Sequence, residues 1–100
     1  MGKFIPGNVL SGRKVVTVAG TAERLSTNKT ETVEVTICAE TDNTDVVVVG
    51  DSDVDATLAT RTGIPLNAGD TYTKNINQLP YVWLDSVISG EGVTFDADCV

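Results

Sequence analysis

Branched side chains and closely spaced turns are the strongest constraint on the fold of this chain. Among its 100 residues, valine occurs 15 times and threonine 14 times. Branching at Cβ restricts χ1, which costs little on a pleated sheet and more in a helix. Turn-forming residues recur about every ten positions, and no segment sustains a 3.6-residue apolar period. The sequence therefore predicts an all-β fold.

Several segments give separate strand predictions. Residues 31–39 alternate most cleanly between apolar and polar positions. The segment 45–49 contains four consecutive valines, which indicates burial on both faces or against a neighbouring chain. Pro65 cannot donate a ladder hydrogen bond, so the short strand around it is expected at a sheet edge. The other predicted strands are 14–19, 23–26, 71–76, 79–87 and 93–99.

Seven or eight short strands separated by turns are typical of a small antiparallel β-sandwich. We expect a jelly-roll-like sandwich, with an immunoglobulin-like sandwich as the alternative. Residues 1–13 hold three glycines, a proline and a few apolar residues without a clear period. They are expected to form an extended N-terminal arm, and residues 14–100 the sandwich domain.

Charge is distributed unevenly along the chain. The net charge of −7 argues against nucleic acid as a partner, because phosphate binding needs clustered Lys and Arg. Residues 1–30 carry five basic and one acidic residue (+4), whereas residues 31–100 carry two basic and 13 acidic residues (−11). The N-terminal part is expected to pack on an acidic body, its own or a neighbour's, or to carry solvated lysines on a loop.

The apolar runs and the strand positions of the two cysteines both indicate the cellular compartment in which the chain folds. No apolar run has the length of a signal peptide or a membrane helix, so we expect a soluble chain made in a cytoplasm, without a membrane partner. Cys38 falls on the polar face of its predicted strand and Cys99 on the apolar face of another. A disulfide between them is not expected, and free thiols fit a reducing compartment.

No residue pattern predicts catalysis or metal binding. Histidine is absent, which removes the commonest general base and the commonest metal ligand. Asp51 to Asp55 has acids at alternate positions, like the start of a calcium loop, but the glycine and glutamate that an EF-hand requires are here Ala56 and Thr62. A solvated acidic turn is favoured over a calcium site. We expect no enzyme, no cofactor and no metal.

Three of the five aromatic residues lie close together in the sequence. Tyr72, Tyr81 and Trp83 would each bury a large area, and the sequence favours a role as core anchors. The alternative is a stacking platform for sugar rings.

Seven short segments follow one another in a distinctive order. They are residues 35–39 (VTICA), 43–45 (NTD), 47–52 (VVVGDS), 63–70 (GIPLNAGD), 77–79 (NQL), 81–85 (YVWLD) and 89–95 (SGEGVTF). In this order and spacing, the chain resembles small virion proteins of tailed bacteriophages, such as capsid decoration (cement) proteins and fibre-associated domains. The resemblance implies no catalytic residues.

The resemblance implies a protein of the virion surface, bound to the major capsid protein as a homotrimer. The residues expected at capsid or inter-subunit contacts are Phe4, Ile5, Val9, Leu10, Arg13, Lys14, Val46 and Val48. A receptor- or glycan-binding module of a phage fibre or tail is one alternative, and an adhesion domain of a cell surface is another.

Overall fold

The structure is a computed structural model that describes residues 8–100. These residues form eight strands and two short 3-10 helices. The strands are β1 (Asn8–Val15), β2 (Glu23–Arg24), β3 (Thr32–Ala39), β4 (Val47–Gly50), β5 (Ile64–Leu66), β6 (Thr71–Asn75), β7 (Trp83–Ser86) and β8 (Gly92–Cys99). The 3-10 helices are η1 (Leu58–Thr60) and η2 (Leu79–Tyr81).

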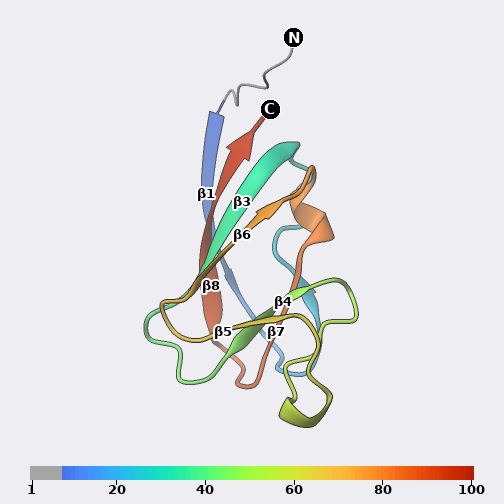
Figure 1. The fold of residues 1–100 in the computed structure, drawn as a ribbon, viewed down its shortest axis with the longest axis vertical. Coiled ribbons are helices and arrows are strands. Elements are labelled where there is room, and N and C mark those ends of the chain that lie inside the picture. Colours follow the sequence, from blue (N-terminus) through green and yellow to red (C-terminus); the bar gives the residue numbers. More distant parts are fainter. Residues whose placement is uncertain (1–7) are drawn as a thin grey trace.

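The strands form two four-stranded antiparallel sheets that pack face to face (Figure 1). The first sheet has the order β1-β8-β3-β6 and the second the order β2-β7-β4-β5. The pairs are nested in the chain: β4 pairs with β5, β3 with β6, β2 with β7 and β1 with β8. This nesting is a jelly roll, so the predicted fold class is confirmed. The immunoglobulin-like alternative, with seven strands divided four and three, is wrong.

The period-two pattern places one face of each central strand in the core. Val35 and Ile37 of β3 are fully buried, and their register partners on β8 are Ala97 and Phe95. These side chains meet the inner face of the second sheet. Burying an aliphatic side chain of this size stabilises the fold by about 1.5–3 kcal/mol.

The valine run of β4 is buried on both faces, which is one of the two alternatives that the sequence left open. Val47 and Val49 belong to the main core, whereas Val48 packs with Val54 and Ala56 in a second apolar cluster. Both clusters consist of residues of this chain. The covering element on the outer side is therefore the chain's own loop and not a neighbouring molecule.

The sandwich begins earlier in the sequence than predicted. Strand β1 pairs with β8 along its whole length, from Asn8 opposite Cys99 to Val15 opposite Gly92. Residues 8–13, expected to belong to the arm, are thus part of a strand of the sandwich. The expected arm also includes residues 1–7, which lie outside the described residues.

Two other predicted strands differ in their bounds. The strand expected at 14–19 ends at Val15, and the chain then turns through residues 16–22. The strand expected at 79–87 is interrupted, because Pro80 lies in η2 and the strand begins only at Trp83. Proline lacks the N–H that a ladder position would need.

A buried carboxylate ties two loops to the second sheet. Asp85 of β7 is 1% exposed, and its two oxygens accept hydrogen bonds from the backbone N–H of Gly20 (2.9 Å) and Ala56 (2.8 Å). The two loops thereby cover Trp83 and Val48 on the outer face of this sheet. The side chain of Asp85 therefore supplies the acceptors for two loop N–H groups that lie outside the strand ladders.

Replacing Asp85 with alanine tests this role. We expect Asp85→Ala to lower the free energy of unfolding by about 2–4 kcal/mol, because the buried N–H of Ala56 and the partly buried N–H of Gly20 both lose their acceptor. Urea unfolding of the two proteins measures the difference. Asp53→Ala is the matched control, since Asp53 is an exposed acid of one of the same loops. Equal losses in both variants would contradict the role assigned to Asp85.

Candidate functional site

Strand β1 is an edge of the first sheet. Among residues 8–100 it pairs only with β8. Its side chains alternate, so Val9 and Arg13 lie on the outer face of the sheet while Leu10 and Lys14 lie on the face toward the core. An edge strand presents backbone N–H and C=O groups that another chain can pair with.

The second half of β1 is firmly packed. A Cβ at Gly12 would overlap the ring of Phe95, so the absence of a side chain at this position allows the aromatic ring to cover the strand. Lys14 forms an ion pair with Glu23, with 2.9 Å between Nζ and Oε1. This half is thereby joined to the body of the sandwich.

The first half of β1 exposes apolar side chains. Val9 is 59% exposed and Leu10 37%, and Val100 directly after β8 is 63% exposed. Asn8 lies opposite Cys99, so the start of β1 and the end of β8 are at the same end of the sandwich (Figure 1). We call these three exposed apolar residues, Val9, Leu10 and Val100, the apolar end; Val9 and Leu10 lie on opposite faces of β1. Phe4 and Ile5 lie outside the described residues, a few positions before it in the chain.

Arg13 bridges β1 and the turn that follows β3. Its guanidinium donates two hydrogen bonds to the two carboxylate oxygens of Glu40, one of them Nη2 to Oε1 at 3.0 Å. The pair holds the pKa of Glu40 below its usual range and raises that of Arg13. The basic N-terminal part was expected either to pack on an acidic body or to remain solvated. Arg13 agrees with the first expectation, because it binds an acidic residue of its own chain.

Lys14 helps to hold the loop that follows β1. Its partner Glu23 also accepts hydrogen bonds from the backbone N–H of Thr17 and Val18, both at 3.0 Å, and from the Thr17 hydroxyl at 2.8 Å. Burial alone would raise the pKa of Glu23, but the hydrogen bonds from Lys14, Val18 and Thr17 lower it to about 2. The ammonium group of Lys14 is therefore paired with a carboxylate of its own chain, that of Glu23.

The two valines expected at an inter-subunit contact lie in different surroundings. Val46 is half-buried just before β4, whereas Val48 is 0% exposed. The interface expected at Val48 is wrong, because the loop holding Val54 and Ala56 folds over it.

The three neighbouring aromatic residues do not form one platform. Tyr72 is half-buried against the core, Tyr81 is 59% exposed, and Trp83 lies on the far side of the second sheet beneath the guanidinium of Arg24, 4.6 Å from its ring centre. The expectation of a core anchor is therefore wrong for Tyr81, because η2 turns its side chain outward.

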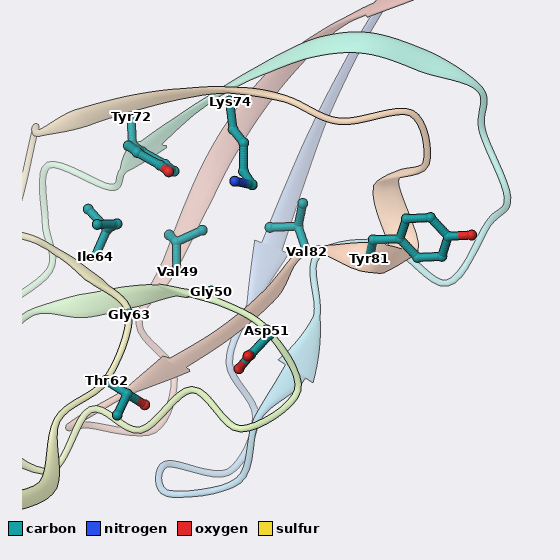
Figure 2. A pocket seen from close by; sticks show the side chains of 10 residues that line it. All are labelled: Val49, Gly50, Asp51, Thr62, Gly63, Ile64, Tyr72, Lys74, Tyr81 and Val82. Atoms are coloured by element: carbon teal, nitrogen blue, oxygen red, sulfur yellow. The ribbon is translucent and has the colours of Figure 1, made fainter.

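A cleft lies on the side of the sandwich where β5 and β6 are the sheet edges. It has a volume of about 260 Å³. Figure 2 shows Tyr72 and Lys74 projecting from β6 toward Val49 and Val82, with Asp51 on the opposite side and the ring of Tyr81 directed away. The polar residues of the cleft, such as Asp51 and Lys74, could not be recognised as a site from the sequence, because only the packing of the two sheets brings them together.

The acidic turn after β4 uses its carboxylates within the loop. Asp51 Oδ1 accepts from the backbone N–H of Asp53 at 2.9 Å, and Asp55 accepts from the Thr60 hydroxyl at 2.6 Å and the Thr57 N–H at 2.9 Å. The Thr60 and Thr57 hydrogen bonds lower the pKa of Asp55. Across residues 8–100, no group of three or more His, Cys, Asp or Glu side chains is placed to hold a metal ion.

The cysteine prediction is confirmed. Cys38 is half-buried, Cys99 is buried, and both are free thiols. In the described part of the chain, no helix is both long enough and apolar enough to span a membrane.

Sequence comparison adds no relatives to this picture. No protein-family model matches the chain, and no curated protein or solved structure matches it.

The titration of Glu23 gives a pH prediction. Its folded pKa of about 2 is below the ordinary value of 4.5, so its stabilising effect is complete above pH 4.5 and is lost as the pH falls toward 2. We expect the free energy of unfolding to fall by on the order of 2 kcal/mol over this window from this group. Denaturant unfolding at a series of pH values should show a flatter acid limb in Glu23→Gln. An unchanged acid limb would contradict the assignment.

Proposed function

We propose that this chain is a bacteriophage capsid decoration (cement) protein that binds the outer shell and stabilises contacts between major capsid subunits. The jelly-roll topology supports the proposal, because this fold recurs in viral capsid proteins and in lectins. Fold alone does not determine function. The resemblance of the seven ordered segments to small phage virion proteins narrows the choice.

The observation that carries the proposal is the apolar end. Val9 and Leu10 expose apolar side chains on the two faces of β1, a sheet edge that is open among the described residues, and Val100 is exposed at the same end of the sandwich. Phe4 and Ile5 precede this surface in the sequence. A partner that covers these side chains gains hydrophobic stabilisation, and β1 offers backbone groups for strand addition.

In this proposal the protein acts by surface complementarity. Each decoration protein contacts neighbouring capsid subunits through the apolar end, and many such contacts on one particle act together. The charged groups of Arg13 and Lys14 are held by Glu40 and Glu23, so they orient β1 and its loop. We further propose that the protein assembles as a homotrimer, which a native mass measurement of the purified protein tests directly.

Attachment through the apolar end predicts a specific loss of binding. Leu10→Asp should weaken binding to purified capsids at least about tenfold, because a desolvated charge replaces an apolar contact. Co-sedimentation of labelled protein with capsids measures the affinity. Leu58→Asp is the matched control, since Leu58 is 80% exposed in η1, away from β1. If the control loses as much affinity, added charge and not the apolar end explains the loss.

The number of copies per particle separates this proposal from its alternative. A decoration protein is expected in many copies per purified virion, because it repeats with the symmetric subunits of the shell, and a fibre module in far fewer. Quantitative mass spectrometry of intact particles measures this number. The fibre alternative has one observation in its favour, which is the cleft lined by Tyr72.

A further inference from the structure

We propose that the cleft between β5 and β6 binds one neutral pyranose ring, such as the terminal sugar of a glycan. The cleft is separate from the apolar end, and sugar binding goes beyond attachment to a capsid. The inference rests on the shape of the cleft, its apolar floor and the charged groups on its opposite walls.

The floor and one wall suit the carbon face of a sugar. Val49 and Val82 belong to the buried core and form the floor, and Tyr72 stands beside them (Figure 2). The C–H groups of a pyranose carry partial positive charge, which is attracted to the electron-rich face of an aromatic ring. A half-buried tyrosine at the mouth of an apolar recess provides this contact.

The other walls supply both donors and acceptors. Lys74 directs its ammonium group into the cleft, and Asp51 presents a carboxylate from the opposite side (Figure 2). Within residues 8–100 the only ion pairs are Arg13–Glu40 and Lys14–Glu23, so Lys74 has no carboxylate partner there. Sugar hydroxyls both donate and accept hydrogen bonds, and therefore fit a site with a donor on one wall and an acceptor on the other.

The wall around Asp51 is already fixed in position. Asp51 Oδ1 accepts the Asp53 N–H at 2.9 Å, which leaves Oδ2 for a ligand. The Thr62 hydroxyl donates to the Asp53 carbonyl at 3.1 Å and keeps lone pairs to accept from a sugar. Gly63 has φ +101, and a Cβ there would lie 2.6 Å from Val54 Cγ2. The close packing at Gly63 holds this wall against β4.

Size and charge define the ligand class. At about 260 Å³ the cleft is smaller than the roughly 300–1,000 Å³ typical of drug-sized ligands, and so it suits a single ring. Asp51 and the net charge of −7 disfavour carboxylated or phosphorylated sugars. A neutral hexopyranose is therefore the ligand to test.

Titration of the full chain with methyl glycosides of glucose, galactose and mannose tests the proposal by NMR. We expect at least one to cause saturable shifts at the backbone amides of Gly50, Gly63 and Lys74. The dissociation constant should be on the order of 1 mM, because one small ring makes few contacts. The absence of saturable shifts at these amides with all three glycosides would overturn the proposal.

Variants assign the effect to the cleft. Lys74→Ala and Asp51→Asn should each weaken binding about tenfold, the usual consequence of losing a hydrogen bond to a charged group. Both residues are exposed, and asparagine keeps the acceptor for the Asp53 N–H, so the fold is retained. Lys29→Ala is the matched control, because Lys29 is an exposed lysine outside this cleft. Its affinity should not change.

Two further results would overturn the proposal. One is equal affinity of Lys74→Ala and the unmodified chain. The other is tighter binding of glucuronate than of the neutral glycosides, because an anionic ligand would contradict the role of Asp51. Capsid binding measured with Lys74→Ala should remain unchanged, and so the cleft and the apolar end are tested independently.

Discussion

Carboxylates that accept backbone N–H groups hold this jelly roll together outside its sheets. Asp85 joins the loops at Gly20 and Ala56 to the second sheet. Glu91 does the same for the turn before β4, with its Oε1 3.0 Å from the Asp45 nitrogen. A chain of 100 residues buries a thin core, and loops fixed in this way enlarge the buried surface. The second apolar cluster depends on this arrangement, because loop residues form one of its sides.

Several of the acidic side chains therefore stabilise the fold. Glu23, Glu40, Asp85 and Glu91 all accept hydrogen bonds within the chain, although composition alone counts them as surface charge. The basic residues of β1 neutralise two of them. The expectation drawn from net charge, which disfavours nucleic acid as a partner, does not locate a binding surface when several of the acidic groups are hydrogen-bonded within the chain.

The sequence predicted those strands that are determined by their own residue pattern. Strand β3 alternates in sequence, and β4 is a run of valines, so both were accessible without the structure. Strand β1 was not, because Gly12 resembles a turn residue until Phe95, far along the chain, covers it. Of the candidate site, the sequence pointed to Val9 and Leu10 as contact residues and to Tyr72 as part of a sugar platform, whereas Val100 and the assembly of the cleft depend on packing between distant segments. Sequence periodicity contains no information on which loops will meet.

The order of strands separates the two surfaces of the molecule. β1 and β6 are opposite edges of the first sheet, with β8 and β3 between them. At roughly 4.8 Å per strand spacing, these edges lie about 14 Å apart. A partner that adds a strand to β1 therefore extends the sheet away from β6. Strand addition at β1 does not cover the cleft beside β6, so the proposed attachment to a shell and the proposed sugar site are compatible in one small domain.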